Sequence, residues 1–166
     1  MALTKSKKKD ILDKVSDIAA KAASIVFVNF HGLSVSDSTA MRRELRKAGV
    51  NYVVAKKTLA RKAFESKKIA GEAPTLEGEL AIVYTASKED TTAPAREVYQ
   101  FQKKFDGKLA ILGGILENSY KNKDDMTAIA AIPSRKTLEG MFVNLLNSPI
   151  QRFVIAMSEI AKTKTA

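Results

Sequence analysis

Apolar positions follow two alternating spacings along the first 116 residues. Short apolar runs predict strands at about 24–30, 51–55, 80–85 and 108–116. Between these runs, apolar residues three and four positions apart predict helices at about 4–23, 37–48, 58–67 and 92–105. Because strands alternate with helices, we expect an α/β fold: a single layered domain with a mixed sheet of about four strands flanked by helices.

The last third of the chain carries helical patterns only. We expect helices at about 124–131 and 135–146, and a final helix from Pro149 onward. Pro133 with Ser134, and Ser148 with Pro149, are the residue types that stop one helix and cap the next. The predicted organisation is an α/β domain over residues 1–132 and an all-helical C-terminal extension over residues 133–166.

An apolar stripe marks the final helix. Its members recur at the spacing of one helix face: Ile150, Phe153, Val154, Met157, Ile160 and Ala161. Such a stripe either covers the protein's own core or lies in a hydrophobic groove of a partner. The spacing alone leaves both interpretations open.

The charge is unevenly distributed along the chain. The formal net charge is +10, from 28 Lys and Arg against 18 Asp and Glu. Residues 1–70 hold 16 of the basic and 6 of the acidic residues, so residues 71–166 hold 12 of each. The whole surplus therefore belongs to the first part of the chain. This segregation favours a polyanionic partner, nucleic acid above all, although a solvated basic face is the alternative.

Several classes of protein are excluded or disfavoured by composition. The chain has no cysteine, which excludes disulfides and thiolate metal sites. No apolar run reaches the ~20 residues of a membrane span. The first residues also lack the apolar segment of a secretory signal. We therefore expect a cytoplasmic protein that has no membrane partner.

Candidate catalytic residues are few. His31 is the only histidine, which excludes paired-histidine metal sites and removes most acid–base arrangements. No glycine-rich loop ends in the Gly-Lys-Ser/Thr pattern of a phosphate-cradling loop. Asp124 and Asp125 lie at a predicted helix start, where acids suit the helix dipole. We predict no enzyme, no catalytic residue, no cofactor and no metal; a small metal-dependent nuclease using these two aspartates is the remote alternative.

The basic residues gather on predicted helix starts and on one strand–helix junction. Lys5, Lys7 and Lys8 lie in the first turns of the first helix, where the dipole disfavours cations unless an anion is bound. Arg42 and Arg43 lie on the second helix. At the junction, the backbone N–H groups of a helix start can join the cations around a phosphate. The residues concerned there are Lys56, Lys57, Thr58, Arg61 and Lys62.

An ordered set of motifs resembles a known family. The motifs are Val28-Asn29-Phe30-His31-Gly32-Leu33-Ser34-Val35, Met41-Arg42-Arg43-Glu44-Leu45-Arg46-Lys47-Ala48-Gly49-Val50, Val54-Ala55-Lys56-Lys57-Thr58-Leu59-Ala60-Arg61-Lys62-Ala63, Gly113-Gly114-Ile115-Leu116-Glu117 and Ile132-Pro133-Ser134-Arg135. In order and spacing they resemble bacterial large-subunit ribosomal protein ten, the base of the ribosomal stalk. The resemblance covers nearly the whole chain.

The resemblance implies a structural constituent of the large ribosomal subunit. Its α/β domain would bind large-subunit rRNA beside ribosomal protein eleven. Its C-terminal helix would carry dimers of the acidic stalk protein seven/twelve, which recruit the GTPases of translation. The family further suggests repression through the leader of its own mRNA. The glycine turn His31-Gly32-Leu33 and the basic junction would contact RNA, and the apolar stripe of the final helix would hold the stalk protein.

A DNA-binding regulator is the second interpretation. The predicted helix at 37–48 is basic and could enter a duplex groove as a reader. Competition between rRNA and duplex DNA for the protein would distinguish these two interpretations.

Overall fold

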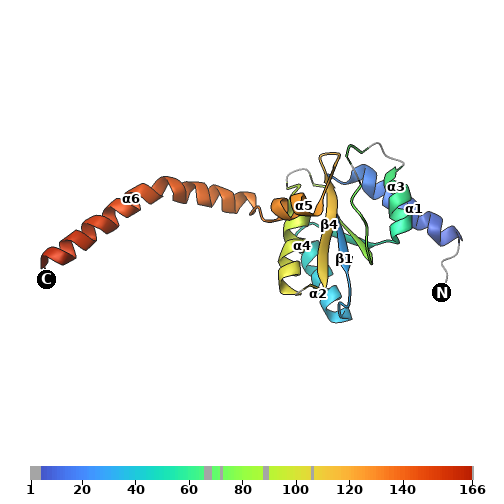
Figure 1. Cartoon of the computed structure of the whole chain (residues 1–166), viewed down its shortest axis with the longest axis horizontal. Coiled ribbons are helices and arrows are strands. Elements are labelled where there is room, and N and C mark those ends of the chain that lie inside the picture. Colours follow the sequence, from blue (N-terminus) through green and yellow to red (C-terminus); the bar gives the residue numbers. More distant parts are fainter. Residues whose placement is uncertain (1–4, 66–68, 72, 88–89, 106, 166) are drawn as a thin grey trace. The chain divides into compact units, whose positions relative to one another are not determined.

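A five-stranded antiparallel sheet forms the centre of the N-terminal part (Figure 1). The computed structural model describes residues 5–65, 69–71, 73–87, 90–105 and 107–165. Contacts divide the chain into two compact units, Met1–Ile132 and Pro133–Ala166. The elements of the first unit are α1 (Lys5–Lys21), β1 (Ser24–Phe30), α2 (Val35–Lys47), β2 (Asn51–Val54), α3 (Lys57–Glu65), β3 (Leu80–Thr85), α4 (Ala93–Lys104), β4 (Leu109–Leu116), β5 (Ser119–Lys121) and α5 (Lys123–Ala130). The second unit is α6 (Arg135–Thr165).

The strands lie in the order β2-β3-β1-β4-β5, with β1 in the middle. All pairings between these strands are antiparallel; for example, Phe27 of β1 lies opposite Ile82 of β3 and Gly113 of β4. The α/β class with flanking helices is confirmed. The sheet is antiparallel rather than mixed. Strands β1 and β2 run in the same direction, as do β3 and β4, but an antiparallel strand lies between the members of each pair.

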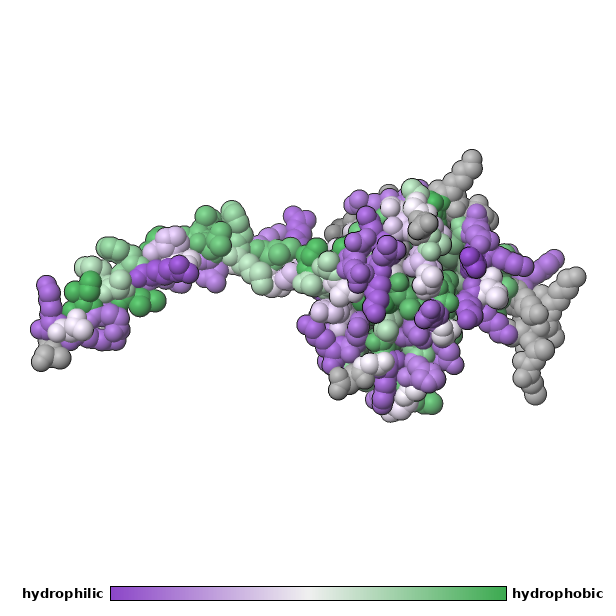
Figure 2. All heavy atoms as spheres, in the orientation of Figure 1, coloured by the Kyte–Doolittle hydropathy of each residue, from purple (hydrophilic) through white to green (hydrophobic). Residues whose placement is uncertain are grey.

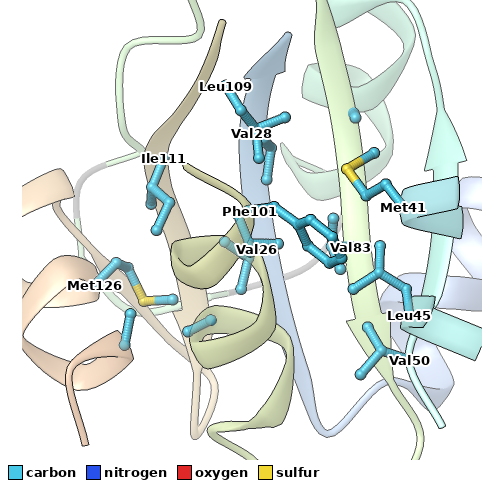
Figure 3. Close-up of a cluster of buried hydrophobic side chains, with 14 of the residues drawn as sticks. Val26, Val28, Met41, Leu45, Val50, Val83, Phe101, Leu109, Ile111 and Met126 are labelled. Atoms are coloured by element: carbon cyan, nitrogen blue, oxygen red, sulfur yellow. The ribbon is translucent and has the colours of Figure 1, made fainter. Parts of the chain in front are cut away.

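Two apolar layers cover the two faces of the sheet. On one face, α1 and α3 pack over Ile25, Phe27 and Ile82. On the other, α2, α4 and α5 pack over a second cluster that includes Val26, Val28, Leu45, Phe101 and Met126 (Figure 3). Successive residues of β1 point to opposite faces, as the period of a strand requires. A strand buried on both faces explains why β1 reads as a continuous apolar run in the sequence.

A bulge in β4 lies beside Gly113 and Gly114, where neighbouring backbone approaches closely. The register with β1 shifts between Phe27 and Val28, so Leu112 is the extra residue. A Cβ atom at Gly114 would lie 2.5 Å from the carbonyl oxygen of Ile25. Gly113 has φ +151°, and a Cβ there would lie 2.7 Å from the carbonyl oxygen of Lys121. Neither position has room for a side chain.

The fifth strand, β5, was not predicted from the sequence. It follows β4 through a two-residue turn in which Glu117 and Asn118 have φ values of 51° and 59°. Such turns normally contain glycine, and asparagine is the next best residue. Because Glu117 is unusual in this conformation, the turn signal is weak in the sequence.

The predicted helices of the first unit exist, with shifted bounds. The helix predicted at 37–48 begins earlier, at Val35. Its N-cap is Ser34, whose hydroxyl oxygen accepts a hydrogen bond from the backbone N–H of Asp37 at 3.1 Å. The helix ends before Gly49, which adopts φ +72° as expected of a C′ glycine.

The second unit is one continuous helix, so the predicted break at Ser148-Pro149 is wrong. Pro149 lies inside α6. A proline removes one backbone hydrogen bond, but the remaining turns on either side keep the helix continuous. The predicted cap at Ser134 is confirmed, because its hydroxyl oxygen accepts from the backbone N–H of Thr137. Figure 2 shows hydrophobic residues exposed along this helix.

Candidate nucleic-acid interface

One end of the sheet gathers the predicted RNA-binding segments of the first unit. Strands β1 and β2 end there, and β3 and β4 begin there, because all their pairings are antiparallel. The loop His31–Leu33 follows β1, and Lys56 with the start of α3 follows β2. Strand β3 separates β1 from β2, so the two segments emerge about 10 Å apart across the sheet.

The start of α3 is the most basic of these segments. Ala55 is buried and anchors the turn, while Lys56, Lys57 and Thr58 are exposed. The carbonyl oxygen of Lys56 accepts from the backbone N–H groups of Leu59 and Ala60 at 2.9 and 3.0 Å. The earlier N–H groups of a helix have no partner within it, and α3 has no acidic residue in its first turn. This end of the helix therefore favours an anion.

The buried face of α3 fixes the orientation of this helix on the sheet. Ala60, Ala63 and Phe64 are buried against the sheet and α1. Arg61 and Lys62 consequently face solvent. The guanidinium of Arg61 pairs with Glu65 at 3.1 Å, with both side chains more than half exposed. An exposed pair of this kind holds the arginine only weakly and leaves it available to a phosphate.

Two hollows flank the start of α3 and share Lys57 and Thr58. The α3 pocket, of about 450 Å³, is lined by α3, segment 73–76, Phe27 and Tyr120. The strand-end hollow, of about 620 Å³, is lined by Ile11, Phe30, residues 54–58 and residues 78–80. Burial raises the pKa of the Tyr120 hydroxyl, and the charge of Glu65 adds to this. Tyr120 is therefore a neutral hydrogen-bonding group at neutral pH.

The glycine turn lies at the same end of the sheet. The backbone N–H of His31 donates to the carbonyl oxygen of Lys108 at 2.9 Å, which ties the turn to the start of β4. Gly32 has φ +66°, a conformation that favours glycine. Leu33 packs against the core, whereas His31 and Gly32 are exposed. Of the three residues predicted to contact RNA in this turn, Leu33 is therefore anchored in the protein, whereas His31 and Gly32 face solvent.

The arginines of α2 lie on the other face of the sheet from α3. Met41 and Leu45 point into the core, so Arg42 and Arg43 are exposed. The guanidinium carbon of Arg42 lies 5.0 Å from the centre of the Tyr52 ring on β2. Burial raises the pKa of Tyr52, although the Arg42 charge opposes the shift. Arg42 therefore lies against the edge strand that leads to Lys56, although α2 covers the face of the sheet opposite the α3 cluster.

Lys5, Lys7 and Lys8 belong to the first turns of α1, and their side chains lie outside the described part of the structure. The helix itself approaches the interface, because Ile11 lines the strand-end hollow together with Lys56 and Lys57. The predicted contacts of these three lysines with RNA stay predictions.

Known proteins are similar to this sequence over nearly its whole length. The profile of the family described as Ribosomal protein L10 matches residues 3–103. The large ribosomal subunit protein uL10 of Lactobacillus johnsonii is 35% identical over 159 residues, covering 96% of this chain and 95% of that protein. The uL10 proteins of Lactobacillus helveticus and Lactobacillus acidophilus are 35% and 33% identical, each covering 96% of this chain and 93% of that protein.

The chain belongs to the ribosomal protein L10 family. It is therefore a protein of the large ribosomal subunit, located on the ribosome in the cytoplasm. This family is not enzymatic, which decides against the nuclease interpretation. In the structure, Asp124 and Asp125 lie exposed in the first turn of α5, as the dipole argument expects. Membership also favours the ribosomal interpretation over a DNA-binding regulator.

Three charged residues of this L10-family interface were not predicted from the sequence. Lys108 is exposed beside the glycine turn, and it directly precedes β4. Glu77 and Glu79 are exposed where β3 begins, so they reduce the positive potential there. The backbone N–H of Glu79 donates to the amide oxygen of Asn29 at 3.2 Å. Their proximity depends on strand pairing, which the isolated sequence does not reveal.

Apolar side chains of α6 form the other candidate surface in this L10-family protein. The predicted residues Ile150, Phe153, Val154, Met157, Ile160 and Ala161 are all exposed. A second exposed apolar group, not predicted from the sequence, lies before Pro149 and comprises Leu138, Met141, Phe142, Val143, Leu145 and Leu146. Phe142 and Phe153 are 60% and 66% exposed. Among the described residues, no helix has the length and apolarity that a membrane span requires.

Proposed function

We propose that the first unit binds large-subunit rRNA through the start of α3 and its neighbours, and that α6 anchors dimers of the acidic stalk protein seven/twelve. The observation that supports RNA binding best is the junction Lys56–Thr58. It combines exposed cations, a helix start without acids and two adjoining hollows at one end of the sheet. The stalk would then recruit the GTPases of translation.

Phosphate contacts supply most of the affinity in this proposal. Lys56, Lys57 and Arg61 neutralise phosphates and release counterions. Among the described residues, none of these three cations lies over an aromatic ring, which disfavours an open stacking platform for single-stranded RNA. Recognition of the backbone and shape of folded rRNA fits the site better.

Replacing Lys56, Lys57 and Arg61 with alanine tests the RNA site. Binding to transcribed large-subunit rRNA should weaken, and the slope of log affinity against log salt should fall by about 2–3, because about three phosphate contacts are lost. A matched control replaces Lys21, Lys123 and Lys136, which are exposed cations outside the interface. Circular dichroism should show that both variants are folded. Equal slopes for the two triple variants would refute the assignment.

The two exposed apolar groups of α6 support the proposal that this helix binds the stalk protein. Large apolar side chains exposed at the spacing of one helix face match the mode in which an amphipathic helix lies in a groove. The two groups lie on either side of Pro149, and each is long enough for several contacts. We therefore expect two dimers of the stalk protein on this helix.

Deletion of residues 149–166 should abolish capture of at least one stalk dimer and leave rRNA binding intact. Within the full chain, Phe153→Asp should weaken capture more than tenfold, because it places a charge in an apolar contact. Gln151→Asp is the control, since it adds the same charge at an exposed polar position. Native mass spectrometry with the purified stalk protein counts the bound dimers. If deletion instead unfolds the first unit, the stripe serves its core.

Two further partners follow from the family resemblance alone. Ribosomal protein eleven would be the neighbour on the rRNA, and the leader of the protein's own mRNA would be a second RNA ligand. Filter binding to the leader transcript tests the latter, with an unrelated transcript of equal length as the control. Equal retention of both transcripts would contradict autoregulation.

A further inference from the structure

We infer that the α3 pocket receives one unpaired nucleobase of the bound RNA, an inference that rests on the RNA binding proposed above. A volume of about 450 Å³ falls within the range of ~300–1,000 Å³ typical of pockets for small organic ligands. The pocket combines an apolar interior with a charged rim, to which α3 contributes Lys57, Arg61 and Glu65. A nucleotide has the complementary construction, because an aromatic base adjoins a phosphate.

Two packed aromatic side chains of the core are among the residues that line the pocket. Phe27 of β1 and Phe64 of α3 meet edge to face, with ring centroids 5.3 Å apart and an interplanar angle of 77°. Both side chains belong to the core and are only 1% and 3% exposed. A base that enters the pocket therefore meets groups whose positions are already set by packing, so insertion costs little ordering of the protein.

Glycine in β4 lets the outer wall approach the sheet. A Cβ atom at Gly113 would lie 2.9 Å from the Cβ of Pro74, so segment 73–76 could not approach so closely over any other residue. The bulge at Leu112 and the glycine after it thus shape the pocket in addition to bending the strand.

The rim explains why a nucleotide fits better than an apolar peptide. Lys57 and Arg61 are exposed cations on the α3 side, where the phosphate of an inserted nucleotide would lie. Thr58, Thr75 and the hydroxyl of Tyr120 supply neutral hydrogen-bonding groups for the polar edges of a base. An apolar side chain would use neither set of groups.

A base contact would let the protein read the RNA sequence, which phosphate contacts alone do not allow. Phosphate contacts position a protein on RNA without reading its sequence. Proteins that read RNA sequence do so chiefly at unpaired bases turned out of the helix and held against aromatic side chains. The α3 pocket lies beside the proposed phosphate contacts and shares Lys57 and Thr58 with the strand-end hollow. One inserted base would therefore fix the register of the rRNA on the protein.

Filling the pocket from its exposed wall tests the inference without disturbing the core. Ala73→Trp in the full chain places a large side chain into the cavity; Ala128→Trp, at an exposed position of α5, is the matched control. The probe is transcribed large-subunit rRNA, and the readout is the reactivity of its unpaired bases toward dimethyl sulfate (adenine and cytosine) and a carbodiimide (guanine and uracil). Wild-type protein and Ala128→Trp should protect one unpaired base. Ala73→Trp should leave it reactive and bind about tenfold more weakly, with an unchanged salt slope.

A second pair of measurements keeps the test decisive if Ala73→Trp does not fold. Thr75→Phe fills the same cavity from the same segment, and an abasic nucleotide at the protected position removes the base while keeping its phosphate. Both should weaken binding by a similar factor. Unchanged affinity and protection in the filled variants would overturn the pocket assignment while the RNA-binding proposal stands. Weaker binding without renewed reactivity of a base would also overturn it. Failure of the wild-type protein to bind rRNA would instead refute the proposed function.

Discussion

Phe27 and Phe153 are the same amino acid in opposite surroundings. Phe27 lies in the central strand and is 1% exposed, whereas Phe153 lies on α6 and is 66% exposed. The first unit covers both faces of its sheet with helices and buries its large apolar side chains between them. Along α6, large apolar side chains from Leu138 to Ile160 are exposed.

This difference separates two uses of hydrophobic residues. In the first unit they stabilise the fold and position the cations of the proposed RNA interface on its surface. In α6 they form contiguous exposed surface, which in soluble proteins usually indicates an interaction site. The charge divides at a different point, inside the first unit: residues 1–70 hold 16 basic and 6 acidic residues, whereas residues 71–166, which include α6, hold 12 of each.

The largest effect on stability is expected when the two phenylalanines are replaced in turn. Phe27→Ala should lower the free energy of unfolding of the first unit by about 3–5 kcal/mol, because it leaves a cavity under α3. Phe153→Ala should change it by less than about 0.5 kcal/mol. All four tyrosines belong to residues 52–120, so tyrosine fluorescence during urea unfolding follows the first unit alone. Equal destabilisation would show that α6 contributes to the core.

Two glycines provide the next comparison. Gly114→Ala should destabilise the first unit by about 1–3 kcal/mol, because the new Cβ would lie 2.5 Å from a carbonyl oxygen of β1. Gly140→Ala should instead stabilise α6 by up to about 1 kcal/mol, since nothing lies within 4 Å of the added atom and alanine favours helix. Thermal unfolding monitored by circular dichroism measures both changes. The same sign for both would contradict the assigned environments.

The smallest effect concerns acid sensitivity. The Arg96 guanidinium hydrogen-bonds Asp90 at 2.8 Å and holds the pKa of that carboxyl below its ordinary value. A carboxyl whose pKa is lower in the folded state stabilises that state at pH values above the ordinary, unfolded-state pKa. This contribution is lost as the pH falls through the lower, folded-state pKa. Asp90→Asn should therefore flatten the pH dependence of unfolding below about pH 4.

The ion pairs of α6 serve as the control for that measurement. In Arg135–Glu139 and Lys162–Glu159, every side chain is more than 60% exposed, whereas Arg96 is only 15% exposed. Exposed pairs contribute little to stability. Glu139→Gln should consequently leave the acid limb unchanged, and a change equal to that of Asp90→Asn would contradict the difference in burial.

The candidate sites were predictable where local pattern determines them. Lys56, Lys57 and Thr58 follow an apolar run and precede a helical one, so their position at a helix start was clear. The exposed stripe of α6 was visible from spacing, but its continuation before Pro149 was overlooked because the proline suggested a new helix. The neighbours Lys108 and Glu79 could not be predicted, because they reach the interface only through the pairing of β1 with β4 and β3.

The sequence by itself determined the α/β class, most strands and helices, and the segregation of charge. These features depend on short-range periodicity, on capping residues and on composition, all of which are local properties. Tertiary structure alone decided the antiparallel order β2-β3-β1-β4-β5, the short strand β5 and the α3 pocket. Each of these depends on contacts between residues distant in the chain, such as Pro74 against Gly113, and local preferences do not encode which distant partners will meet.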